Sequence, residues 1–313
     1  MRGMLKILIL GSAAGGGSPQ WNCNSDVSKA VRSGGNGVSP RTQSSIAVTA
    51  DGDEWFLFNA SPDLGSQILN NKQMHPKKNL RHSPISGVVL TNGDVDHVAG
   101  LLTLRERQNL AVYAHKRVHS VLKENSIFNV LNPDYVERRE MKMNQKFELK
   151  NKEGKGVGIE VEAFEVPGKI ALWLEDESKG KDFGTEDGDT IGLKISSTNN
   201  QESFYYIPAC AKMTNELSEK IRGSEIVLFD GTLWTNDEMA SSKVGQKTGQ
   251  RMGHMNNSGE NGSMNQLKDL NIKKKIYIHI NTTNPILIPN SDERKIVEEN
   301  GWEVSYDGME INL

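Results

Sequence analysis

Short apolar runs, each about as long as a β-strand, recur along the chain and end in polar residues. The clearest are residues 7–10, 85–90, 226–229 and 276–280, none of which contains Asp, Glu, Lys or Arg. Runs of this length and character are typical of strands that are buried on both faces. After residues 85–90 comes an apolar-periodic segment, residues 98–110, which predicts a helix. Strands interleaved with helices favour an α/β fold in which helices cover the sheets.

The remaining segments indicate how the chain is organised. Residues 45–49 and 55–58 are β-rich runs separated by Asp-Gly-Asp, which predicts a hairpin. Residues 175–189 are charged and lack an apolar face, so they are predicted to form a solvated loop, and residues 245–263 a second, long loop. Because no repeat or linker divides the chain, we expect residues 1–313 to form a single domain.

Composition excludes several classes of protein. The formal net charge of −3 argues against a dedicated nucleic-acid binder, which usually carries a basic face. The two cysteines, Cys23 and Cys210, exclude a disulfide framework and fit a reducing compartment. No apolar stretch approaches the roughly 20 residues of a membrane helix, and residues 7–10 are shorter than the apolar core of a signal peptide. We therefore expect a cytoplasmic protein that neither binds nucleic acid nor inserts into a membrane.

Residues of the types that bind metals occur where the apolar runs end. Asp96 and His97 follow residues 85–90, Asp230 follows residues 226–229, and His279 lies within the last run. Each alone has an ordinary explanation, since Asp often forms turns or caps helices and a histidine between isoleucines is often a core residue. Taken together, two imidazoles and two carboxylates on strand ends suit Fe(II), Mn or Zn.

The order of these residues resembles a known superfamily. Residues 92–97 (NGDVDH) are similar to the His-x-His-x-Asp-His loop of the metallo-β-lactamase superfamily, with the first two histidines replaced. The resemblance implies that superfamily's αββα sandwich, two mixed sheets flanked by helices. It also implies that Asp96, His97, Asp230 and His279 hold one metal.

The other metal position of that superfamily falls on Asn92, Asp94 and Lys169. An ammonium group cannot ligate a cation, so the resemblance implies a mononuclear site. Losing half of a two-metal centre makes ordinary hydrolysis a weaker hypothesis. A zinc hydrolase of the wider superfamily remains an alternative.

A narrower resemblance covers almost the whole chain. Seven strings are similar to the pyrroloquinoline quinone (PQQ) synthesis protein B family: residues 11–17, 19–23, 40–45, 59–63, 229–234, 251–255 and 279–285. The resemblance implies a cytoplasmic enzyme with one Fe(II), for which Zn or Mn can substitute. Its expected partners are O₂ and a cross-linked Glu–Tyr precursor, whose tyrosine ring is hydroxylated. The alternative is a carrier that binds PQQ or its precursor for transport to the periplasm without turnover.

Further residues are assigned roles on the same strings and on their chemistry. The catalytic candidates are Asp94, Lys169 and His254; the substrate-binding candidates are Arg41, Arg251 and Asn284, with Arg105 a weaker one. The two arginines are favoured because the precursor carries several carboxylates and guanidinium groups bind these in a bidentate manner. His254 could instead be an exposed loop histidine, and Lys169 a surface lysine beside a turn. The other histidines, His75, His82, His115 and His119, are assigned to structure or surface.

One departure from the family concerns zinc. The family typically follows Trp-Asn-Cys with further cysteines that bind a structural zinc, whereas this chain has Ser25 and Ser28 after Cys23. A single thiolate cannot make a closed tetrahedral zinc site. We therefore expect no structural zinc and a loop around Cys23 held by packing alone. The oligomeric state stays open, a homodimer included.

Overall fold

A computed structural model describes residues 4–35, 37–180, 184–200 and 202–313. Two mixed sheets pack face to face, each with seven strands among these residues. The first sheet runs in the order β14 (Glu310–Asn312), β1 (Lys6–Gly11), β2 (Ser45–Thr49), β3 (Trp55–Phe58), β4 (Ile85–Val89), β5 (Leu110–Ala114), β6 (Val136–Glu140). The second runs in the order β13 (Trp302–Val304), β12 (Lys274–Ile278), β11 (Ile226–Asp230), β10 (Ser203–Ile207), β9 (Ile191–Ser197), β8 (Gly156–Glu165), β7 (Lys146–Lys150).

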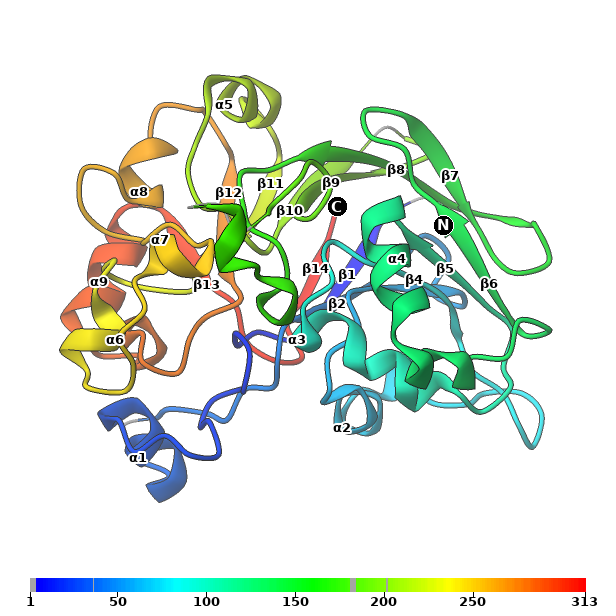
Figure 1. The fold of residues 1–313 in the computed structure, drawn as a ribbon, viewed down its shortest axis with the longest axis horizontal. Helices are drawn as coiled ribbons and strands as arrows, with labels where there is room; N and C mark the ends of the chain where they lie inside the picture. Colours follow the sequence, from blue (N-terminus) through cyan, green and yellow to red (C-terminus); the bar gives the residue numbers. More distant parts are fainter. Residues whose placement is uncertain (1–3, 36, 181–183, 201) are drawn as a thin grey trace.

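Helices cover the outer face of each sheet. They are α1 (Asp26–Ser33), α2 (Leu64–Asn70), α3 (Val95–Val98), α4 (Lys116–Glu124), α5 (Asn215–Ile221), α6 (Glu238–Ser241), α7 (Gly249–Met252), α8 (Ser263–Gln266) and α9 (Asp292–Glu299). In Figure 1, α2–α4 lie beside β4 and β5, and α6–α9 lie on the opposite side beside β11–β13. This arrangement confirms the predicted αββα sandwich. Within the described residues, no helix has the length and apolar character needed to cross a membrane.

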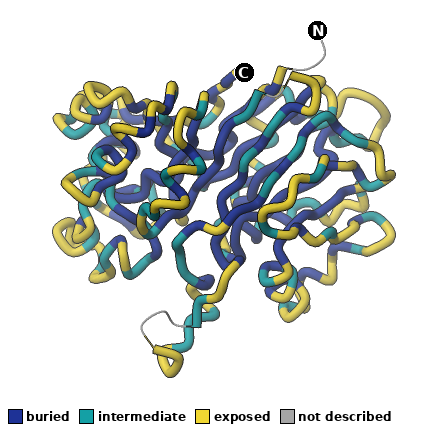
Figure 2. The backbone as a smooth tube through the Cα atoms, turned by 90° about the horizontal axis from the view of Figure 1, so that it is seen from above, coloured by how far each residue is buried: buried dark blue, intermediate teal, exposed yellow. Residues whose placement is uncertain are grey.

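The alternation of side chains along a strand explains the uninterrupted apolar runs. In β1, Ile7 and Ile9 belong to the core between the two sheets, whereas Leu8 and Leu10 pack into the core beneath the outer helices. A strand between two apolar layers must be apolar on both faces. Figure 2 shows the result as buried strands through the middle of the molecule, with exposed backbone confined mainly to the periphery.

Parallel pairing brings the ends of distant strands to one edge. Strands β3–β6 run parallel to one another in the first sheet, as do strands β10–β13 in the second. The predicted hairpin is confirmed, because β2 pairs antiparallel with β3. The carboxyl ends of β4, β11 and β12 are followed by the loops that carry the candidate ligands, as expected for open parallel sheets.

The helix predicted over residues 98–110 is confirmed only in its first half, and mostly as a 3₁₀ helix. The chain forms the short helix α3, then a 3₁₀ helix over Ala99–Leu104, and β5 already begins at Leu110. Tertiary hydrogen bonds replace the helical ones: Ala60 N donates to His97 O at 2.7 Å, and Gly100 N donates to Ala60 O at 2.8 Å. A Cβ at Gly100 would lie 2.2 Å from Ser61 O, so the two segments approach too closely for a side chain there.

Candidate metal centre

The candidate ligands lie close together at the carboxyl edge of the strands, where all but the fully buried Asp230 line one pocket. Asp96 and His97 lie in α3 after β4, Asp230 ends β11, and His279 directly follows β12. The pocket has a volume of about 360 Å³, and its lining includes Asp94, Asp96, His97, Lys169, Thr232, His254 and His279. Residues more than 180 positions apart in the sequence are therefore brought together, as the order of the motifs predicted.

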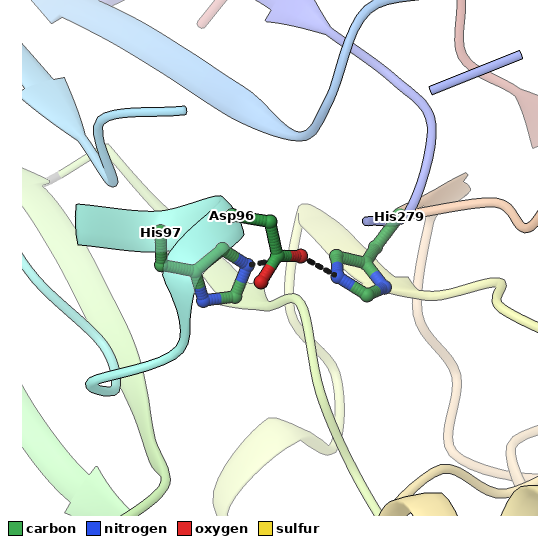
Figure 3. A group of neighbouring side chains, drawn as sticks. All are labelled: Asp96, His97 and His279. Atoms are coloured by element: carbon green, nitrogen blue, oxygen red, sulfur yellow. Dashed lines mark hydrogen bonds and ion pairs between the residues drawn. The ribbon is translucent and has the colours of Figure 1, made fainter. Parts of the chain in front are cut away.

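Asp96, His97 and His279 form a compact triad (Figure 3). The Asp96 Oδ2 atom lies 3.1 Å from His279 Nε2 and 3.8 Å from His97 Nε2. The two imidazole rings are 5.4 Å apart between centroids. One carboxylate and two imidazoles within mutual reach match the donor set of a facial two-histidine, one-carboxylate site.

His97 is held in the form that can bind a metal. Its Nδ1–H donates to Asn92 Oδ1 at 2.7 Å, and the same oxygen accepts from the Asp94 backbone N–H at 3.0 Å. The Nε2 atom is buried and has no hydrogen-bond partner among the described residues. A histidine that binds a metal usually donates a hydrogen bond from one ring nitrogen and keeps a free lone pair on the other. Asn92, at the vacated first-metal position, thus orients His97.

Asp230 and His254 form a second group that shares His279. The Asp230 Oδ2 atom accepts from His254 Nδ1 at 2.7 Å and from the Cys210 backbone N–H at 2.9 Å. The His254 ring stacks on His279 with centroids 5.1 Å apart. The predicted ligands are divided between two overlapping triads, Asp96–His97–His279 and Asp230–His254–His279. The second triad adds His254, which the sequence indicates as a catalytic residue and not as a ligand. His254 lies inside the site, 14% exposed at its side chain, and is not an exposed loop residue.

Thr232 connects these groups, and the sequence reasoning missed it. Its Oγ1 lies 2.6 Å from Asp230 Oδ1, 2.9 Å from His279 Nδ1 and 3.1 Å from His254 Nδ1. The available signal was its place two residues after a strand-ending aspartate, where a hydroxyl can reach back to that carboxylate. Thr232 is a positioning residue for both triads.

Burial and neighbouring charges set the protonation states in the pocket. Burial lowers the pKa of His97 to about 4, so the imidazole is neutral at neutral pH. Burial alone would raise the pKa of Asp96, but the imidazoles of His97 and His279 outweigh it and lower that pKa. Burial and the Asp96 charge raise the pKa of Asp94. The triad thus combines an ionised carboxylate with a neutral imidazole, which is what a cation needs.

Lys169 and Arg251 share one carboxylate beside the pocket. The Glu175 Oε1 atom accepts from Lys169 Nζ at 2.5 Å and from Arg251 Nη1 at 3.0 Å, and Oε2 accepts from Arg251 Nη2 at 2.7 Å. The hydrogen bonds from Arg251, aided by Lys169, lower the pKa of Glu175 to about 2 despite its partial burial. Lys169 is therefore not a surface lysine.

The predicted solvated loop over residues 175–189 is wrong at its two ends. Glu175 is paired with Lys169 and Arg251, and the buried Asp189 accepts hydrogen bonds from both Nε and Nη2 of Arg117. Residues 181–183 of this segment lie outside the described residues. The second predicted loop, residues 245–263, contains α7, whose first turn is capped by Thr248 Oγ1. Charge alone did not indicate these partners, because they come from distant segments.

None of the three substrate-binding candidates lines the pocket: Arg251 lies beside it, paired with Glu175, and the other two lie farther away. Arg41 is half-buried and lines a different hollow, and its guanidinium donates to Ser12 Oγ and Ser305 O. Asn284 is fully buried, donates to Gly231 O and accepts from the Ile286 backbone N–H. Both side chains fasten loops to one another, and neither lines the cavity that contains the triad.

The loop around Cys23 is held by hydrogen bonds as well as by packing, so the expectation of packing alone is wrong. Ser25 caps α1 by accepting from the Ser28 backbone N–H, and it also accepts from Cys23 Sγ. Ser28 Oγ lies 2.9 Å from Thr282 Oγ1. The two serines in place of cysteines therefore connect the loop to the segment after His279.

The buried acid Glu238 hydrogen-bonds the segment after His279, and its titration makes the stability of the protein depend on pH. Glu238 accepts from the Trp234 backbone N–H and from Thr283 Oγ1, and burial raises its pKa to about 7. Since this exceeds the pKa of an unfolded glutamate, the stabilisation is full below about pH 4.5 and is lost as the pH rises to about 7. We expect the free energy of unfolding to fall by about 2 kcal/mol between pH 5 and pH 8 through this group.

Urea unfolding at both pH values checks this expectation. Glu238→Gln should flatten the dependence by that amount, whereas Glu216→Gln, the same change at an exposed position, should leave it as it is. An equally steep loss in Glu238→Gln would contradict the assignment.

Comparisons with known proteins agree with this geometry. Residues 54–280 match the family model described as beta-lactamase superfamily domain. The chain is 48% identical over 312 residues to coenzyme PQQ synthesis protein B of Rhodopseudomonas palustris (strain BisB5), covering 99% of this chain and 100% of that one. It is 47% identical over 309 residues to the protein of the same name from Methylorubrum extorquens (strain PA1), again covering 99% and 100%.

A solved structure supports the same relationship. Zn(2+)-bound PqqB from Methylobacterium extorquens superposes with a TM-score of 0.93 at 47% identity, over 98% of this chain and 100% of that one. Identity at this level over the full length shows common family membership. The chain belongs to the coenzyme PQQ synthesis protein B family, within the β-lactamase superfamily.

Proposed function

We propose that this protein acts in PQQ biosynthesis as an iron- and O₂-dependent hydroxylase of the tyrosine ring of a cross-linked Glu–Tyr precursor. The observation that carries the proposal is the buried triad with the unpartnered Nε2 atom of His97. Asp96, His97 and His279 would hold the metal, with Asp230 and His254 beside them. Fe(II) bound there would supply the reduction of O₂, as in other two-histidine, one-carboxylate sites.

The absence of imidazoles at the other metal position supports oxygenation over hydrolysis. Asn92 is committed to His97, Asp94 accepts from the Leu172 backbone N–H at 3.0 Å, and Lys169 is paired with Glu175. Two-metal hydrolases need ligands on both sides of the attacking water. Here that side of the pocket offers a carboxyl with a raised pKa, Asp94, which can exchange a proton with a phenol.

The test is a mass measurement. Protein loaded anaerobically with Fe(II) is mixed with the Glu–Tyr precursor, an external reductant and isotopically labelled O₂. We expect one labelled oxygen atom in the tyrosine ring, with the second atom reduced to water by electrons from the reductant. Zn-loaded protein is the matched control and should give no product, because Zn has no redox chemistry.

Two other outcomes would contradict hydroxylation and identify the alternatives. Tight, stoichiometric binding of PQQ without any mass gain would indicate a carrier. Two zinc ions per chain together with esterase or lactamase turnover would indicate a hydrolase of the wider superfamily.

A further inference from the structure

Lys169, Glu175 and Arg251 form a largely buried cluster of charged side chains, held in place by hydrogen bonds, beside the metal pocket. Side-chain exposures are 15% for Lys169, 9% for Glu175 and 29% for Arg251. Two cations converge on one carboxylate, which receives a bidentate guanidinium and an ammonium. This arrangement is how proteins recognise a ligand carboxylate with high specificity.

The backbone is shaped to bring Lys169 to this place. Gly253 has φ +83°, and a Cβ there would lie 2.8 Å from Lys169 Cγ. The absence of a side chain at Gly253 lets the lysine stem cross the end of α7 on its way along the pocket wall, which Lys169 and Gly253 both line. The ammonium group is therefore directed by the fold and is not a freely rotating surface charge.

The segment that carries Glu175 also covers part of the pocket. Leu172 N donates to Asp94 Oδ1 at 3.0 Å, and Trp173 Nε1 donates to Gly93 O at 3.3 Å. The residues Leu172 and Trp173 are nevertheless 52% and 42% exposed. Large apolar side chains left in solvent next to paired cations suit a ligand that is both aromatic and anionic.

We propose that Lys169 and Arg251 form a carboxylate-binding subsite that Glu175 fills in the free protein and that a carboxylate of an aromatic polycarboxylate ligand takes over. The inference rests on the proposed function for the class of ligand, since PQQ and its precursor carry several carboxylates. Glu175 then acts as an internal competitor, because a tethered carboxylate is present at a high effective concentration. Its displacement frees the segment over Leu172 and Trp173 to contact the ligand.

The experiment measures PQQ binding to the Zn-loaded protein, in which no turnover occurs. If Glu175 fills the subsite nine-tenths of the time, Glu175→Gln should tighten PQQ binding by about tenfold, because the fraction of competent sites rises accordingly. Glu177→Gln is the matched control, the same change two residues away at an exposed position, and should change the dissociation constant less than about twofold. Methyl-esterified PQQ should bind both variants equally.

Two further variants keep the inference testable if Glu175→Gln does not fold. Glu175→Asp shortens the internal carboxylate and should also tighten PQQ binding, by a smaller factor. Arg251→Met should weaken it, and in the double variant with Glu175→Gln the gain should largely disappear, as coupled partners require. Weaker or unchanged PQQ binding in Glu175→Gln or Glu175→Asp would overturn the inference and assign Glu175 a structural role. Because no oxygenation is measured, this result is independent of whether the hydroxylase proposal holds.

Discussion

Replacing His97 by alanine is expected to lower the affinity for Fe(II) or Zn by more than about a hundredfold, since losing even an outer partner of a ligand costs ten- to hundredfold. The change removes the one triad nitrogen that is buried without a hydrogen-bond partner. It also leaves Asn92 Oδ1 without the imidazole that it orients. Metal content after dialysis, and competition with a chelator of known affinity, measure the effect.

His119→Ala is the matched control for this variant. His119 is a partly buried histidine on α4 whose Nε2 contacts Arg139 O on β6, and it does not line the pocket. The His119→Ala variant should retain the metal, while its free energy of unfolding falls by an amount comparable to that in His97→Ala. Should His97→Ala retain wild-type metal affinity, the triad is not the metal site and the hydroxylase proposal fails with it.

The strands were predictable because their signal is local. Runs such as residues 226–229 are apolar on both faces, and they became β11 with only a one-residue extension to Asp230. The same locality explains the partial failure over residues 98–110. Its apolar period fitted a helix, but hydrogen bonds with Ala60, about 40 residues earlier, were decisive. No window of the sequence contains that partner.

For the candidate site, too, the residues with a local sequence signal were predictable and those that depend on distant partners were not. Asp96, His97 and His279 were predictable because they follow strands whose carboxyl ends share an edge. Arg41 and Asn284 come from equally characteristic strings, yet their side chains hydrogen-bond loops to one another away from the pocket. The sequence around an arginine does not show whether its guanidinium binds a substrate or hydrogen-bonds a backbone carbonyl. Glu175 was missed for the converse reason, because its partner Arg251 is 76 residues away.

The second large effect is expected from Thr232→Val, which should weaken metal binding about ten- to hundredfold without removing any ligand. The Thr232 hydroxyl has one proton and two acceptors nearby, Asp230 Oδ1 at 2.6 Å and His279 O at 2.9 Å. The closer, charged carboxylate takes that proton, which leaves a lone pair of the hydroxyl for His279 Nδ1 at 2.9 Å. His279 therefore carries a proton on Nδ1 and directs Nε2 toward Asp96, where both residues would hold a metal. Valine has the same shape but no hydroxyl, so that orientation is lost and Nδ1 stays buried without a partner.

Thr232→Ser separates this role from simple packing, because serine keeps the hydroxyl and loses only a methyl group. Chelator competition should give Thr232→Ser an affinity within a few-fold of the wild type, while Thr232→Val shows the full loss. Folding stability provides the second readout, since one unsatisfied buried donor costs about 1–3 kcal/mol in Thr232→Val alone. Equal metal affinities for the two variants would show that Thr232 only fills space. The orientation of His279 would then have to come from its backbone, whose φ of +56° is unusual for a non-glycine residue.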